Sequence, residues 1–312
     1  MSIWVDASGW PIPPAVLLGC LIAEVLYYRG WRVLVKAEQA KAARTKAYPS
    51  FDSTRAGEFQ WDSWFWRGTY FLGAVIITLM ASSAPVDILS GRLFWVHMIQ
   101  HLLIMIVIAP LVVAGAPLLP MWLGLPNWAR KLVRKSAMLK VGSPLHRLGH
   151  WLRLPVVSCG LLIIGMWAWH WPTLYDLALT NAAIHDWCEH LTFLAVSVLF
   201  WTQVIPSPPL RIHLGYLWRV VYLGIAIAQN VLLAMILAFV QAPLYAPYAH
   251  LSTGPGGLSA LADQRFGAGI MWTVGDFPFI AVICALGLLW LSSESDDAEI
   301  TIKPDTVLKL KR

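Results

Sequence analysis

Charged residues are scarce in this 312-residue chain. Asp, Glu, Lys and Arg make up 13% of it, against about a quarter in an average soluble domain, and 58% of the residues are hydrophobic. This composition excludes an ordinary soluble domain and indicates that most of the chain lies in lipid. The 18 Trp agree with this, because many stand at the ends of apolar runs, where an interfacial aromatic belt forms.

Cysteine motifs and a cationic leader are also missing. No CxxC spacing occurs, which excludes a disulfide framework and a thiolate zinc motif. The Cys residues stand in separate apolar segments, at Cys20, Cys159, Cys188 and Cys284. No Lys or Arg precedes Arg29, so the basic region that begins a cleaved signal peptide is absent. We therefore expect the first apolar run to form a spanning helix.

Apolar segments of near-spanning length follow one another along the whole chain. A transmembrane helix needs roughly 20 residues, and the segments that approach this length are 12–34, 66–84, 92–114, 154–171, 184–205, 214–240 and 266–292. No internal repeat or second domain is evident. The sequence predicts an all-α fold: a single polytopic membrane helix bundle over 1–292, with about seven transmembrane helices and a flexible cytoplasmic tail at 293–312.

The basic residues predict the orientation of this bundle. If seven helices alternate across the membrane, all of the 23 Lys and Arg except Arg92 and Arg265 fall on one side. The positive-inside rule places that side in the cytoplasm. The N-terminus is then outside, the C-terminus is cytoplasmic, the acid-free stretch 115–153 is cytoplasmic and 241–263 faces outward. The net charge of +6 thus reflects topology, and no nucleic-acid partner is implied.

Polar residues that are rare in lipid recur near the outer ends of several segments. An isolated ionisable side chain in hydrocarbon costs several kcal/mol, so such residues are usually functional. The set comprises His97, His101, His170, His185, Asp186, Cys188, Glu189, His190, Asp263, Gln264 and Met271. With a rise of about 1.5 Å per residue, the five histidines and the carboxylates share one depth in the outer leaflet, where we expect them to converge, and Met271 lies two turns deeper.

The spacing of these residues favours a metal site. His97 and His101 are i,i+4 and share a helix face, as in other HxxxH sites. His185 and His190 are five apart and point in different directions on an α-helix, so only one would join a given ion. We predict a ligand set of His97, His101, His170, His185, His190 and Asp263. The supporting or further ligands are Asp186, Cys188, Glu189, Gln264 and Met271, with Asp186 or Glu189 orienting an imidazole ring.

Simpler roles remain open for individual residues. A lone histidine in lipid can hydrogen-bond a neighbouring helix, Asp263 can cap the seventh helix, and Met271 can pack. Imidazole suits copper, zinc, iron and nickel, whereas a ligating Cys188 favours Cu(I). His146 and His150 are also i,i+4, but an amphipathic segment on the inner membrane surface accounts for them without metal.

Four blocks of the sequence resemble the CtaG-type assembly factors of caa-type cytochrome c oxidase. The blocks are HMIQHLLIMIVIAPLVVAGAP (97–117), HWPTLYDLALTNAAIHDWCEHLTFLAVSVLFW (170–201), APLYAPYAHL (242–251) and LADQRFGAGIMW (261–272). The resemblance implies a bacterial inner-membrane protein that matures the oxidase through its copper centres, with oxidase subunits and other copper chaperones as partners. By that resemblance the family's motif positions are His97, His101, His170, His185, His190, Asp263 and Gln264. Residues 36–58 and 293–312 match no shared motif.

Two other functions remain open at this point. An intramembrane hydrolase would hold zinc on three histidines and use Glu189 or Asp263 to activate water, although no HExxH motif is present. A membrane haem protein would use axial histidines such as His101 and His190, which leaves His97 without a role. We expect a non-enzymatic assembly factor that binds copper, with zinc as the other candidate metal.

Overall fold

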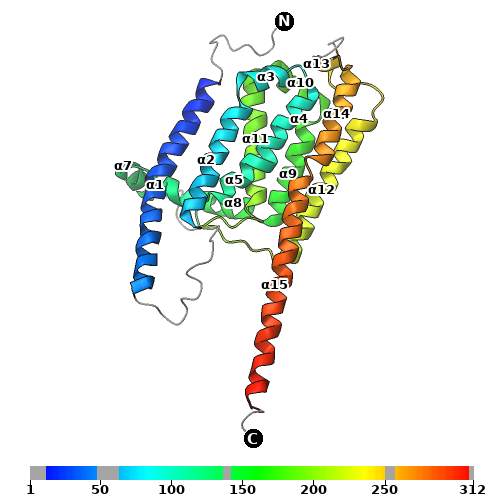
Figure 1. The fold of residues 1–312 in the computed structure, drawn as a ribbon. Helices are drawn as coiled ribbons and strands as arrows, with labels where there is room; N and C mark the ends of the chain where they lie inside the picture. The colour runs from blue at the N-terminus through cyan, green and yellow to red at the C-terminus, as the bar shows by residue number, and fades with distance from the viewer. Residues whose placement is uncertain (1–11, 48–62, 136–141, 250–256, 309–312) are drawn as a thin grey trace.

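The structure is a computed structural model that describes residues 12–47, 63–135, 142–249 and 257–308. Within these residues the chain forms helices and their connections, and no strand occurs (Figure 1). The predicted all-α fold is therefore confirmed.

The chain contains both long and short helices. The longer ones are α1 (Pro14–Ala47), α2 (Trp64–Ala81), α9 (Pro155–Trp169), α11 (His190–Trp201), α12 (Tyr216–Phe239), α14 (Ala260–Thr273) and α15 (Phe277–Leu308). The shorter ones are α3 (Ala84–Ser90), α4 (Phe94–Leu102), α5 (Ala109–Ala114), α6 (Leu118–Gly124), α7 (Asn127–Lys135), α8 (Pro144–Leu152), α10 (Pro172–Thr180) and α13 (Ala246–Ala249). Two π-helical segments, η2 (Leu103–Ile108) and η4 (Ile184–Glu189), lead directly into α5 and α11.

Each predicted segment overlaps one or more helices, but fewer helices qualify as membrane spans than the sequence predicts. Four stretches are long and apolar enough to cross a membrane: Trp64–Ala81, Phe94–Ala114, Tyr216–Phe239 and Ala260–Ser292. The pair α8 and α9, bent by 75°, makes a fifth candidate if it is one span. The first and fifth predicted segments fall short because Glu24 and Arg29 in one, and the acidic residues of η4 in the other, lower their hydropathy.

The long helices pack side by side around the continuous run α4–η2–α5 (Figure 1). This run is the most buried of the candidate spans, with 61% of its residues buried against 22–44% in the others. It contacts α14, α2 and α11. The indole N–H of Trp201 in α11 donates to the Met105 carbonyl at 2.8 Å, which satisfies a carbonyl inside the widened turn of η2. Polar side chains on α4 are consequently enclosed by protein.

The bundle has two distinct ends (Figure 1). The short helices α3, α10 and α13 gather at one end, and α8 lies at the other. α1 packs at the side of the bundle, against α2 and α6. α15 extends beyond the neighbouring helices and runs to Leu308, so that it includes most of the segment predicted as a tail.

Glycines allow α1 and α6 to approach backbone to backbone. A Cβ placed on Gly124 would overlap the Leu26 carbonyl, and one placed on Gly30 would overlap the Pro120 carbonyl. Only glycine leaves room at such a crossing. These two positions therefore seat α1 on the bundle.

A polar bridge braces the break between α14 and α15. The Asn230 side-chain amide in α12 donates to the Met271 carbonyl and to Asp276 Oδ1, both at 2.9 Å. Asn230 and Asp276 are both buried, so each satisfies part of the other's hydrogen-bonding capacity. The bridge holds α12 against the break that separates these two helices.

Candidate metal centre

Five histidines, two of them on one helix and three on other elements, converge inside the bundle. His97 and His101 lie on α4, His170 follows α9, His185 lies in η4 and His190 begins α11. The ring centroids of His97 lie 4.2 Å from His101 and 5.1 Å from His185. Those of His101 lie 5.7 Å from His190 and 6.3 Å from His170. The imidazoles thus form one continuous cluster.

The π-helical turn η4 brings His185 and His190 to the same side. The His190 amide donates to the His185 carbonyl, a bond between residues five apart, as defines a π-helix. The two ring centroids are 4.1 Å apart. The prediction that these rings point in different directions is wrong, because it assumed the tighter turn of an α-helix.

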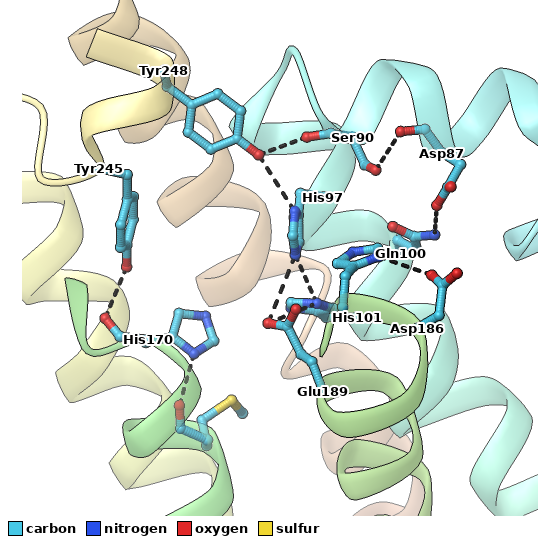
Figure 2. Close-up of polar contacts among 12 residues, drawn as sticks. Asp87, Ser90, His97, Gln100, His101, His170, Asp186, Glu189, Tyr245 and Tyr248 are labelled. Atoms are coloured by element: carbon cyan, nitrogen blue, oxygen red, sulfur yellow. Dashed lines mark hydrogen bonds and ion pairs between the residues drawn. The ribbon is translucent and has the colours of Figure 1, made fainter. Parts of the chain in front are cut away.

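A carboxylate closes the group around α4 (Figure 2). His97 Nε2 and His101 Nε2 are 2.8 Å apart. Glu189 Oε1 lies 3.4 Å from the Nε2 atom of His101 and 3.9 Å from that of His97. Glu189 has an exposed fraction of 0%, and neither of its oxygens has a hydrogen-bond partner among the described residues. Burial of an ionised carboxylate is costly unless a cation or a proton neutralises it.

Tyr248 fixes the protonation of His97. The Tyr248 hydroxyl donates to the Ser90 carbonyl at 2.6 Å, so its single proton is committed. The 3.3 Å contact between this hydroxyl and His97 Nδ1 must then have Nδ1–H as the donor. The lone pair of His97 is consequently on Nε2, which faces His101 and Glu189.

Two further histidines are oriented in the same way. His170 Nδ1 lies 2.8 Å from the Met166 carbonyl, and His185 Nδ1 lies 3.1 Å from Asp186 Oδ1. Both oxygens act as acceptors, so Nδ1 carries the proton in each ring and Nε2 keeps its lone pair. Hydrogen bonds of this kind orient metal-binding histidines in known sites.

The ligand atoms fall into two groups that share His185. In the first group, atoms of His97, His101, His185 and Glu189 all lie within 4.8 Å of one another, and every member is buried. In the second group, His185, Asp186 and His190 satisfy the same limit, and two members are partly exposed.

The first group has the dimensions of a metal site. Metal–nitrogen bonds of about 2.0–2.1 Å place adjacent ligands of one ion roughly 3 Å apart, close to the observed 2.8 and 3.4 Å. Several buried polar atoms also have no hydrogen-bond partner among the described residues: both Glu189 oxygens, His101 Nδ1, His170 Nε2 and His190 Nε2. Buried polar atoms are normally paired. The residues present therefore fit a metal ion.

Asp263, predicted as a ligand, instead caps α4. Its Oδ2 accepts the Phe94 amide at 2.7 Å and its Oδ1 accepts the Trp95 amide at 3.2 Å. It belongs to neither ligand group. A carboxylate at a helix N-terminus satisfies free amides and favours the dipole. Asp263 thereby fixes the start of α4, one turn before His97.

His170, predicted as a ligand, and Cys188 also belong to neither ligand group, and the other predicted residues make different contacts. Gln264 accepts the Leu244 amide at 2.8 Å and donates to the Leu237 carbonyl at 2.9 Å, so both ends of its side chain are used. Met271 is buried in the apolar core and Cys188 is exposed. The structure gives Gln264 a bracing role between α12 and α14.

Tyrosines support the cluster, and the sequence assigned them no role. Besides Tyr248, the Tyr245 hydroxyl donates to the His170 carbonyl at 3.0 Å (Figure 2). The ring of Tyr175 stacks on Tyr245, with centroids 3.8 Å apart, and lies 5.1 Å from His97. Tyr245 and Tyr248 belong to the APLYAPYAHL block, so their presence in that block was the available signal.

The Gln100 side chain ties α4 to the end of α2 and to α3. The Gln100 side-chain amide donates to the Ala81 carbonyl at 3.0 Å and to Asp87 Oδ1 at 3.3 Å. Asp87 lies in the short helix α3, outside the candidate spans. Burial raises the pKa of its carboxyl, and the nearby His185 opposes this rise. These contacts fix the rotation of α4 and with it the direction of both histidines.

An apolar groove gives access to the second ligand group. Its cavity of about 420 Å³ lies between α1, α2, η2, α5, η4 and α11. The polar residues in its lining include Asp87, Asp186 and His190. The partly exposed ligand group therefore borders the groove, whereas the fully buried group lies behind it.

Comparison with known proteins identifies the family. The model of the cytochrome c oxidase caa3 assembly factors (Caa3_CtaG) matches residues 51–293. Uncharacterized proteins of Mycobacterium bovis and Mycobacterium tuberculosis are each 26% identical over 219 residues, covering 68% of this chain and 32% of the relative. One from Mycobacterium leprae is 22% identical over 246 residues, covering 75% and 35%. This chain spans about a third of the length of these curated relatives.

No solved structure matches the chain. The family model, however, covers well over half of it and includes every histidine of the cluster. The chain belongs to the cytochrome c oxidase caa3 assembly factor family.

Proposed function

We propose that this protein binds copper at the histidine cluster and delivers it to a subunit of cytochrome c oxidase in the bacterial inner membrane. The observation that carries the proposal is the fully buried group of His97, His101, His185 and Glu189. Three imidazoles and a carboxylate without a hydrogen-bond partner among the described residues are costly in a membrane interior. Coordination of a cation offsets that cost.

The ligand chemistry and the family support copper. Imidazole nitrogen with one carboxylate oxygen suits copper and zinc, and the family assists assembly of an oxidase. Zinc is the competing metal, and metal analysis separates the two.

The two ligand groups support a carrier role. A carrier must release its metal, which favours an open set of mixed ligands over a closed cage. His185 belongs to both groups, and Asp186 and His190 border the apolar groove. An ion that keeps His185 as a ligand can move from the buried group to the group beside the groove, where a partner subunit reaches it.

The distribution of basic residues supports an outward-facing cluster. Arg147 and Arg153 lie in and directly after α8, at the end of the bundle away from α3, α10 and α13 (Figure 1). The positive-inside rule assigns the α8 end to the cytoplasm. The histidines then lie toward the outer face, where oxidase copper centres are loaded.

The geometry disfavours the two rival functions. A haem bound to His101 Nε2 would need the space that His97 and Glu189 occupy, at 2.8 and 3.4 Å from that atom. A hydrolase would need Glu189 to activate water at a site that a substrate reaches, yet Glu189 has an exposed fraction of 0%.

The proposal is tested in a deletion strain grown at limiting copper. Wild-type protein should restore cytochrome c oxidase activity, whereas a His97→Ala/His101→Ala variant should leave activity low while oxidase subunits are still made. Added copper should partly restore activity in the variant strain. His146→Ala, at the other end of the bundle, is the matched control and should behave as wild type. Normal oxidase activity in the deletion strain at low copper would refute the assembly role.

A further inference from the structure

A polar cavity lies at the end of the bundle opposite the histidine cluster of the candidate metal centre. It has a volume of about 240 Å³ and forms where α8 bends into α9, beside the connection that follows α11. The polar residues of its lining are His150, Arg153, Thr202, Gln203, Arg211 and His213. None of them takes part in either ligand group of the candidate metal centre.

Among the described residues, no acidic side chain compensates the charge in this cavity. Its lining contains two arginines and no acidic residue, and the sequence has no Asp or Glu in 88–175 or 190–262. Within the described part of the chain neither Arg153 nor Arg211 pairs with a carboxylate. A cavity with cations alone attracts an anion.

One of the two arginines is held in place by buried contacts. Arg153 Nε donates to the Gly149 carbonyl at 3.3 Å. The Arg153 carbonyl accepts the side-chain amide of Gln203 at 3.0 Å, and Gln203 is only 3% exposed. These contacts use one of the guanidinium's N–H groups. The other N–H groups of the Arg153 guanidinium form a planar fork, which is the geometry that binds two phosphate oxygens at once.

The α8 helix places the cavity at the level of lipid headgroups. α8 meets α9 at 75°, and its apolar residues Leu145, Leu148 and Trp151 are exposed along one side. His146, Arg147 and His150 occupy intervening positions, as in an amphipathic helix that lies in the membrane interface. Phosphate groups of the bilayer are found at this depth.

We propose that this cavity is a phosphate-binding site, in which Arg153 and Arg211 hold the phosphate group of an anionic phospholipid or free phosphate. The sequence motif SPLHRLGHWLRLP, which the metal centre does not use, supplies the α8 side of the site. Basic pockets between membrane helices bind acidic lipid headgroups in other proteins. The site is independent of metal binding.

Equilibrium binding to the purified full-length protein in a nonionic detergent tests the proposal. The probes are dihexanoyl phosphatidylglycerol, dihexanoyl phosphatidylcholine and inorganic phosphate, each titrated by calorimetry. Phosphatidylglycerol should bind at least about tenfold more tightly than phosphatidylcholine, because an arginine fork prefers an uncompensated phosphate charge. If inorganic phosphate binds as tightly and displaces the lipid, the source is free phosphate; if it does not, the source is the headgroup.

Variants connect the binding to the cavity. Arg153→Gln/Arg211→Gln should abolish the preference for phosphatidylglycerol, and Arg211→Gln alone should reduce it. Arg211 is exposed, and its side chain makes no hydrogen bond to the other described residues, so the single variant is expected to fold even if the double variant does not. Arg130→Gln/Arg134→Gln in α7 removes the same charge elsewhere and should retain the preference. Equal binding of both lipids with no phosphate binding, or an equal loss in the α7 control, would overturn the proposal.

Discussion

His185 and His190 are separated by five residues in the sequence, and their imidazole centroids lie 4.1 Å apart. The cause is the π-helical turn η4, in which the His190 amide bonds to the His185 carbonyl. A second π-helical segment, η2, begins two residues after His101. π-Helical turns are rare and are frequent at functional sites. In this protein, a π-helical turn lies beside each of the two histidine pairs of the cluster, His97/His101 and His185/His190.

A change in the number of residues between His185 and His190 should show that their shared side depends on spacing. Deletion of Trp187, whose side chain is 50% exposed, converts the wide turn to an α-helical one and makes the two histidines i,i+4, a spacing that shares a helix face, so metal bound per chain should stay near the wild-type value. Insertion of one Ala after Trp187 should instead rotate the two histidines apart by about 100° and lower the metal bound, while helix content by circular dichroism stays at the wild-type value. Trp187→Ala keeps the spacing and should retain metal. Full metal binding by the insertion variant would show that the spacing of the two histidines is not needed.

Tyr248→Phe should weaken metal binding without unfolding the protein. The change removes the acceptor that keeps the proton of His97 on Nδ1, and loss of such supporting contacts costs about 10-fold or more in affinity. The Ser90 carbonyl also loses a donor, at a stability cost of about 1 kcal/mol. Competition with a chelator measures the affinity, and Tyr216→Phe at the start of α12 serves as control. An unchanged metal affinity would show that Tyr248 does not support metal binding by His97.

Two glycine-to-alanine substitutions should distinguish the close packing of α1 against α6 from the general effect of alanine on helix stability. Gly124→Ala forces a Cβ against the Leu26 carbonyl, and overpacking of this kind costs about 1–3 kcal/mol. Gly160→Ala in α9 has no atom within 4 Å of the new Cβ and gains helix propensity of up to about 1 kcal/mol. In detergent, Tm should fall for the first variant and stay level or rise for the second. Equal shifts would contradict the close contact of α1 with α6.

Reporter fusions test the orientation. Truncation after Lys135, at the end of α7, should give a cytoplasmic signal, and truncation after Ala249, at the end of α13, should give an external one. The two points lie at positions that the basic residues assign to opposite sides. Identical signals from both fusions would refute the seven-helix topology and the outer position of the histidines.

Much of this site could be predicted from the sequence because ionisable side chains are rare in apolar membrane segments. His97, His101 and His190 interrupt apolar segments, and the alternation of basic loops assigns them one depth. The register of η4 could not be predicted in this way, because one inserted residue leaves an apolar segment looking the same. The sequence therefore predicted that the His185 and His190 rings point in different directions, which is wrong.

Long-range capping also lies beyond what a local pattern reveals. Asp263 accepts the amides of Phe94 and Trp95, which precede it by 169 and 168 residues. The local sequence around Asp263 suggests only a cap for its own helix. Tyr248 is similar, since its contact with His97 joins residues 151 apart. Such pairings depend on how the helices pack, which composition and periodicity do not specify.

Metal content per purified chain shows whether the buried histidines bind metal. Wild type, His101→Ala and His146→Ala are purified side by side, and copper and zinc are measured in each. His101 lies 2.8 Å from His97 and 3.4 Å from Glu189, whereas His146 lies on α8, at the other end of the bundle. Wild type and His146→Ala should carry stoichiometric copper, and His101→Ala should have lost it. Full metal content in His101→Ala would contradict metal binding by this histidine cluster.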